Sequence, residues 1–163
     1  NPSLKNKEAV AHAVGVGAVI FHDLKNDRTN NFDFALEEVV QFEGETGPYV
    51  QYTHARGMSI LRKANHTVDT KEAFSLTDDD AWEVLKLIEN HPNAVRFAEE
   101  KCEPSVIAKF VINLAQAFNK YYAHTKVLVE DEAFNSRIAL VQTTASLLKQ
   151  GLALLGVAAP DEM

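Results

Sequence analysis

The sequence lacks several features that would place it in particular classes of protein. Its single cysteine, Cys102, excludes an intrachain disulfide and favours a reducing, cytoplasmic location. No apolar run approaches the roughly 20 residues that span a bilayer, and the polar start, residues 1–5, carries no secretory pattern, so no membrane association is expected. The first residue is not methionine, which indicates a fragment or a processed chain.

Positive charge is also scarce. The chain has 16 lysine and arginine residues against 23 aspartate and glutamate residues, which gives a formal net charge of −7. An indiscriminate nucleic-acid binder normally needs a strongly basic field, so the net charge argues against that class. A local cationic face on an acidic body remains open. Any contact with RNA would then depend on stacking and shape as much as on bulk charge.

Patterns for catalysis and metal binding are missing as well. Gly15 and Gly17 begin like a dinucleotide fingerprint, but Ile20 occupies the third glycine position, so close helix packing explains the pair better. The six histidines show no zinc spacing, and the acids beside Cys102 disfavour a reactive thiolate. The acidic run at residues 78–80 suits a helix start. The sequence predicts no self-sufficient active site, no bound cofactor and no metal.

What the chain does contain is apolar residues at helical spacing along most of its length. With 163 residues it is long enough for one core, and the pattern predicts an all-α helical bundle. Helices are expected over residues 7–24, 46–64, 77–90, 92–102, 105–124 and 136–155.

Local signals set the ends of these expected helices. Thr77 resembles the first residue of a capping box, and Pro92 typically begins a helix. Gly156 provides a left-handed stop after the last helix. The helix over residues 105–124 has an apolar face made of Ile107, Phe110, Val111, Leu114, Phe118 and Tyr121. Residues 1–45 are interpreted as a helical connector, and residues 46–163 as the bundle.

The most specific pattern lies at residues 42–56, which read FEGETGPYVQYTHAR. This segment keeps every fixed position of FEGxTxPYxQYxxxR, a signature of the arginyl-tRNA synthetases. The segments VGVGAV at 14–19, FNKYY at 118–122 and GLALLGV at 151–157 resemble other parts of the same family in order and spacing. The chain therefore resembles the C-terminal, anticodon-binding region of that family over nearly its whole length.

The resemblance implies a class I aminoacyl-tRNA synthetase, a ligase that attaches arginine to its tRNA using ATP and magnesium. The family's nucleotide-binding motifs, of HIGH and KMSK type, belong to an earlier domain and do not occur here, so this fragment alone is not expected to be catalytic. The implied partners are the anticodon stem-loop of an arginine tRNA and the upstream catalytic domain of the same chain. A monomer is expected.

The resemblance also implies which residues meet the RNA. In relatives an aromatic residue on the matching helix, the terminal methionine and the loop matching residues 25–31 approach the anticodon. The residues carried over as base or phosphate contacts are Asn119, Lys120, Tyr121, Met163, Lys25, Arg28 and Arg137.

Alternatives to these assignments remain open. Tyr121 falls on the apolar face of its helix, so a core position is an equal possibility, and Tyr122 is then the alternative ring for stacking. A second group, which comprises Tyr49, Gln51, Tyr52 and Arg56, is expected to lock the connector onto the bundle. The rival function is a helical scaffold that binds protein, which would show an exposed apolar stripe without nearby cations.

Overall fold

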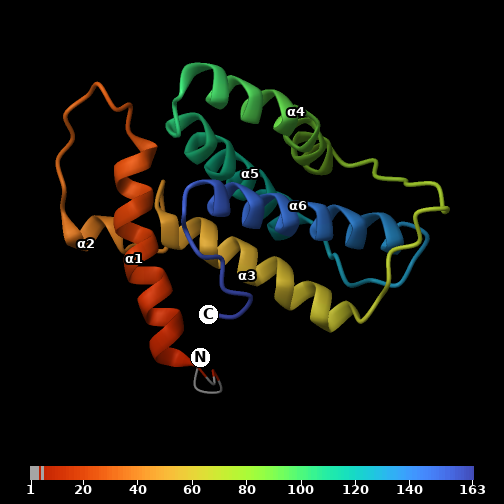
Figure 1. Cartoon of the computed structure of the whole chain (residues 1–163). Coiled ribbons are helices and arrows are strands. Elements are labelled where there is room, and N and C mark those ends of the chain that lie inside the picture. The colour runs from red at the N-terminus through yellow and green to blue at the C-terminus, as the bar shows by residue number, and fades with distance from the viewer. Residues whose placement is uncertain (1–3, 5) are drawn as a thin grey trace.

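The computed structural model describes residue 4 and residues 6–163, and within them the only regular secondary structure is helical (Figure 1). Residues 1–3 and 5, which belong to the polar start and to the predicted connector, lie outside the described residues. The helices are α1 (Lys7–Lys25), α2 (Leu36–Val39), α3 (Gly47–Ala64), α4 (Asp79–Lys101), α5 (Ser105–His124) and α6 (Phe134–Leu154). The prediction of an all-α bundle is confirmed.

The centre of the bundle is formed by α5 and α6, which are covered by α4 and α3 (Figure 1). The bounds of α5 agree with the prediction, and all six residues of its predicted apolar face are buried. On α6, which begins two residues earlier than predicted, Ile138, Val141, Leu148 and Leu152 are buried against this face. Full burial of one such side chain contributes about 1.5–3 kcal/mol, so packing of α5 on α6 stabilises the bundle together with the contacts of α4 on α5 and of α3 on α6.

The prediction of two short helices separated near Pro92 is wrong, because α4 is one continuous helix with Pro92 inside it. An internal proline removes one backbone hydrogen bond and costs about 3 kcal/mol. Val84 before the proline and Ala94 after it are both buried, so packing on α5 offsets that cost. The predicted cap is also displaced by one residue: Asp78, rather than Thr77, accepts the hydrogen bond from the Ala81 amide at 2.7 Å.

The N-terminal helix α1 packs on α3 and α5, and Phe21 of α1 is fully buried in the common core. Helices α1 and α3 approach closely where Gly17 of α1 faces the first turn of α3, which begins at Gly47. A Cβ on Gly47 would lie 2.9 Å from the carbonyl oxygen of Gly17, and a Cβ on Gly17 would lie 2.8 Å from Gln51 Nε2. Gly15 faces open space, so only one of the two expected packing glycines has that role. The division between connector and bundle at residue 45 stays a prediction.

The last helix ends in a glycine turn that directs the C-terminal tail, residues 158–163, back along α3 (Figure 1). Gly156 has φ of 71°, as the left-handed stop requires, and the Val157 amide donates to the Leu152 carbonyl oxygen at 2.9 Å. Val157 is buried, which fixes the exit from the turn. Gln51 Nε2 of α3 then donates to the carbonyl oxygen of Ala158 at 2.7 Å.

Candidate nucleic-acid interface

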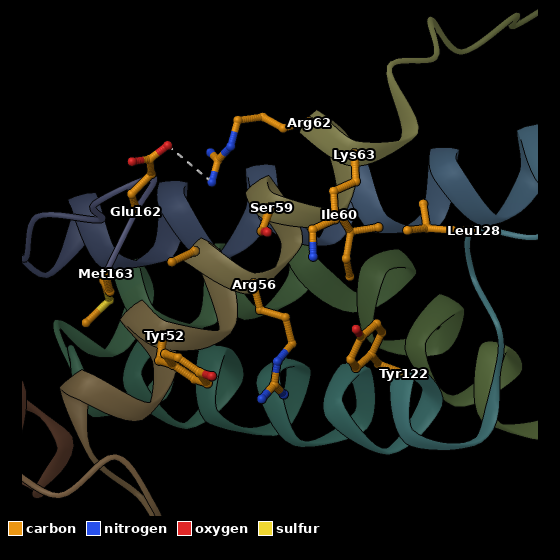
Figure 2. Close-up of a pocket in the computed structure, with 11 residues that line it drawn as sticks. Tyr52, Arg56, Ser59, Ile60, Arg62, Lys63, Tyr122, Leu128, Glu162 and Met163 are labelled. Carbon is orange, nitrogen blue, oxygen red and sulfur yellow. Dashed lines mark ion pairs between the residues drawn. The ribbon is translucent and has the colours of Figure 1, made fainter. Parts of the chain in front are cut away.

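A cleft of about 420 Å³ opens between α3, α5 and the C-terminal tail (Figure 2). Most of its lining comes from one face of α3, and the loop after α5 contributes Leu128. The complete lining consists of Tyr52, Ala55, Arg56, Ser59, Ile60, Arg62, Lys63, Tyr122, Leu128, Glu162 and Met163. We call this the α3–α5 cleft.

The centre of the α3–α5 cleft is a guanidinium flanked by two aromatic rings. The Arg56 guanidinium carbon lies 4.9 Å from the ring centroid of Tyr52 and 5.5 Å from that of Tyr122. Both rings remain exposed, at 42% for Tyr52 and 41% for Tyr122. Each cation–ring contact contributes about 0.5–1 kcal/mol at an exposed site, so the three groups hold one another in place while their outer surfaces stay free.

Helical spacing explains how these side chains come together. Tyr52, Arg56, Ser59 and Lys63 are separated by four, three and four residues, which places them on one face of α3. On α5, Tyr122 follows Phe118 by four residues, and their rings lie nearly parallel at 20°, with centroids 6.5 Å apart. The buried Phe118 therefore orients the exposed Tyr122.

Asn119 holds the central arginine from the α5 side. Its Oδ1 accepts a hydrogen bond from Arg56 Nη1, and its Nδ2 donates to Tyr49 Oη at 3.0 Å and to Thr53 Oγ1 at 2.9 Å. Both the oxygen and the nitrogen of the Asn119 amide are thus hydrogen-bonded, and the orientation of the Arg56 guanidinium is fixed before any ligand binds. Such prior ordering lowers the entropy cost of binding.

The α3–α5 cleft is locally positive although the whole chain is acidic. Arg56, Arg62 and Lys63 line it, and Glu162 is the one acidic residue among the described lining residues. Arg62 is shared with the tail, since its Nη2 lies 3.5 Å from Glu162 Oε1. A surface that combines exposed rings with cations can stack on unpaired bases and contact the phosphates between them.

Tyr121, the residue carried over as the base-stacking ring, does not reach this surface. Its ring has no exposed area, and its hydroxyl has no hydrogen-bond partner among the described residues. Burial raises the pKa of the Tyr121 hydroxyl above its ordinary value of 10.0, with a further contribution from Asp78. A ring that cannot be approached without opening the bundle cannot stack on a base, whereas the neighbouring Tyr122 is exposed and lines the cleft.

Arg137 is also withdrawn from the surface, with 7% of its area exposed. Its Nε donates to the Val127 carbonyl oxygen at 3.2 Å, and its Nη2 donates to the Val129 carbonyl oxygen and, at 2.7 Å, to Asp131 Oδ1. The Arg137 hydrogen bond is the main cause that lowers the pKa of Asp131. The arginine therefore ties the loop after α5 to α6, and this bonding does not fit the phosphate contact expected from the sequence.

Lys120 lies on the exposed side of α5 that faces α4 and is paired there. Its Nζ is 2.7 Å from Asp80 Oδ1, and His124 Nδ1 is 2.6 Å from Asp80 Oδ2. The Lys120 and His124 hydrogen bonds lower the pKa of Asp80, and the Asp80 hydrogen bond raises the pKa of Lys120. The lysine is not among the described residues that line the α3–α5 cleft.

Lys25, the last residue of α1, and Arg28, in the loop that follows, both bind other parts of the fold. Lys25 Nζ donates to the Glu45 carbonyl oxygen at 3.0 Å. Arg28 Nη1 donates at 2.6 Å to the carbonyl oxygen of Cys102, at the end of α4. Of the described residues, neither cation lines the α3–α5 cleft, so the structure brings together only Asn119 and Met163 from the predicted set.

The sequence interpretation does not place Tyr52 and Arg56 at a common cleft, because it expects them to lock the connector onto the bundle. Gln51 does link the two parts, because its Nε2 donates to the Ala13 carbonyl oxygen at 3.2 Å. The Tyr49 hydroxyl instead accepts from Asn119, which lies within the bundle. The missed signal was the spacing of polar and aromatic residues on the outer face of α3, where Tyr52 and Arg56 are one turn apart.

Two further properties bear on possible ligands. Among residues 4 and 6–163, no helix combines the length and the apolar character that crossing a bilayer requires. The same part of the chain has no group of three or more His, Cys, Asp or Glu side chains arranged to hold a metal ion.

Comparison with known proteins gives a consistent result. The family model described as the DALR anticodon binding domain matches residues 50–163. The arginine–tRNA ligases of Enterococcus faecalis and Streptococcus thermophilus are 65% and 58% identical over 163 residues. Those alignments cover 100% of this chain and 29% of each relative, so the chain spans less than a third of their length.

Solved structures agree with this match. The arginyl-tRNA synthetase of Thermus thermophilus superposes with a TM-score of 0.92 at 36% identity, covering 100% of this chain and 29% of the other. The arginyl-tRNA synthetase of Plasmodium falciparum gives a TM-score of 0.87 at 27% identity, covering 95% and 28%. The chain belongs to the DALR anticodon-binding domain family, in the form found in arginyl-tRNA synthetases.

Proposed function

We propose that this chain is the tRNA-binding part of an arginine–tRNA ligase and that the α3–α5 cleft receives unpaired anticodon nucleotides of an arginine tRNA. The remainder of the ligase, a catalytic domain in the same polypeptide, uses ATP and magnesium to activate arginine. The ligase works as a cytoplasmic monomer. The observation that carries the proposal is the exposed group of Tyr52, Arg56 and Tyr122.

The chemistry of this group suits single-stranded RNA. Anticodon bases are unpaired, so their faces are free to stack on a ring or a guanidinium plane. Arg62 and Lys63 lie on the same face of the α3–α5 cleft and can contact phosphates. With a net charge of −7, the whole molecule repels RNA in general. Binding therefore depends on the local geometry of the cleft.

The first experiment measures binding of the 163-residue chain to a fluorescent anticodon stem-loop of arginine tRNA. Removing a stacking ring costs about 1–3 kcal/mol per base, so Tyr122→Ala should weaken binding roughly 5- to 150-fold. Trp82→Ala is the matched control. Trp82 is 60% exposed on α4 and lines a different groove, so its loss should leave binding unchanged.

The second experiment tests specificity. A stem-loop with the same stem and a different anticodon should bind more weakly, and binding of both should weaken as salt is raised. Equal affinity for the two stem-loops, or equal loss in the Tyr122→Ala and Trp82→Ala variants, would refute the assignment of the α3–α5 cleft. Capture of protein with no RNA binding would favour the scaffold alternative.

A further inference from the structure

The C-terminal tail is fastened to α3 next to the α3–α5 cleft. His54 Nε2 of α3 lies 3.0 Å from Asp161 Oδ1, and Arg62 Nη1 donates to the Asp161 carbonyl oxygen at 3.1 Å. Met163 follows two residues later and lines the cleft (Figure 2). Because so short a segment separates them, the position of Met163 depends on how firmly Asp161 is held.

His54 is an unusual anchor because both of its ring nitrogens face hydrogen-bond acceptors. Its side chain is 1% exposed, Nδ1 is 3.0 Å from the Ala145 carbonyl oxygen, and Nε2 is 3.0 Å from the Asp161 carboxylate. A neutral imidazole carries one N–H and can donate to only one of them. The imidazolium donates to both, so it is the form that satisfies this geometry.

The charges around His54 support that form. The Asp161 carboxylate is its counter-ion, and the His54 hydrogen bond is the largest cause that lowers the pKa of Asp161. Lys149 of α6 approaches the same carboxylate at 3.3 Å from the exposed side. Arg62 of α3 binds the tail backbone and pairs with Glu162. Asp161 is thus held by cationic groups from two helices, and the buried imidazolium has an acid beside it.

We propose that His54 and Asp161 are positioning residues of the α3–α5 cleft: their proton-dependent ion pair fastens the tail so that Met163 completes the wall of the RNA site. The consequence for RNA rests on the function proposed above, whereas the fastening of the tail does not. The sign follows from the geometry. A neutral His54 makes only one of its two hydrogen bonds and no ion pair, so the tail is held less firmly in that form than by the imidazolium.

The chain contains two methionines, which allows a direct test. Selective ¹³C-methyl labelling gives one NMR signal from Met58 and one from Met163, and Met58→Leu assigns them. Met58 lies one helical turn after His54 on α3, so its line width reports a position that stays on the helix. The Met163 signal should be broad or shifted at about pH 6 and sharpen as pH rises towards about 9, while the Met58 line width stays constant.

Two variants that each remove one negative charge distinguish the effect of the His54–Asp161 ion pair from the effect of a change in net charge. Asp161→Asn removes the acid that His54 faces, and Glu162→Gln removes the next acid, which pairs with exposed Arg62. In Asp161→Asn the Met163 signal should be sharp at every pH. In Glu162→Gln it should keep the pH response of the unmodified chain. An unchanged response in Asp161→Asn, or its loss in both variants, would overturn the proposal.

The RNA measurement then tests positioning. Asp161→Asn should weaken stem-loop binding roughly threefold to tenfold, within the range expected for coupled neighbours. The matched control for binding is Glu83→Gln, which also removes one acid. Glu83 pairs with exposed Lys86 on α4 and is not among the described residues that line the cleft, so this change should leave binding unchanged. If the His54–Asp161 pair affects RNA binding through Met163, the double variant Asp161→Asn/Met163→Ala should bind the stem-loop as strongly as Met163→Ala alone. Full additivity of the two changes would refute that route.

The two readouts keep the proposals apart. If the unmodified chain binds no RNA but Met163 responds to pH as described, the function of the cleft fails and the fastening of the tail stands. If RNA binds and depends on Tyr122 while the Met163 signal ignores both pH and Asp161→Asn, the role of His54 fails and the function stands.

Discussion

Replacing Tyr121 with alanine should unfold the bundle at a much lower temperature, because this ring fills the centre of the core. Tyr121 has no exposed area and packs beside Phe118, with ring centroids 6.5 Å apart. Truncating a fully buried aromatic side chain costs about 3–5 kcal/mol, since the transfer free energy is lost and a cavity remains. For a domain of this size each kcal/mol lowers the melting temperature by about 2–4 °C, so the expected drop is roughly 6–20 °C.

The matched change Tyr121→Phe isolates the hydroxyl. This group is buried and has no hydrogen-bond partner among the described residues, so the native state pays for its desolvation without compensation. Phenylalanine keeps the ring and removes that cost, and the melting temperature should stay the same or rise slightly. Thermal unfolding followed by circular dichroism measures both variants.

The neighbouring Tyr122 provides the contrast in the same assay. At 41% exposure its truncation should change the melting temperature far less than that of Tyr121, while it weakens stem-loop binding. The reasoning would be refuted if Tyr121→Ala remained as stable as the unmodified chain and lost RNA binding. That result would mean that Tyr121 reaches the ligand and that the core described above is wrong.

Three further predictions concern the scaffold. Gly151→Ala should lower the unfolding free energy measured in urea, because a Cβ at this position would collide with the Val111 side chain across the α5–α6 contact. Overpacking of this kind costs about 1–3 kcal/mol, which is the size of the expected decrease. Asp78→Ala should cost about 1 kcal/mol in the same titration by removing the cap of α4. Arg137 lowers the pKa of Asp131, so the pair stabilises the fold above the ordinary pKa of 3.8, and this contribution is lost as pH falls below that value. In Asp131→Asn the urea midpoint should therefore fall less on acidification than in the unmodified chain. The same fall in both proteins would contradict this.

Much of the fold was predictable because it depends on local signals. The face of α5 from Ile107 to Tyr121 repeats at helical spacing, and burying it requires only another apolar helix. The cap at Thr46 and the turn at Gly156 are also local, since each depends on one residue type at one position. Pro92 was misjudged because the packing that offsets an internal proline involves residues of α5, which the local pattern does not contain.

The candidate site was predictable only in part. The family signature identified the region, and Asn119 and Met163 do lie at or beside the cleft. The choice between Tyr121 and Tyr122 could not be made from the residue type, because the two rings are adjacent and differ by about 100° around the helix axis. Arg137 has the same charge as Arg56, yet it is buried in bonds to its own loop.

The sequence by itself determined the all-helical fold class, most of the long helices, the apolar face of α5, the acidic net charge and the family signature. These properties depend on neighbours three or four residues apart, or on the order of residues in a motif. The tertiary structure decided which cations remain available and which ring meets solvent. It also carried the tail back along α3, which set His54 beside Asp161, 107 residues later. Such a pair forms only when both backbones are already in place, so no local pattern encodes it.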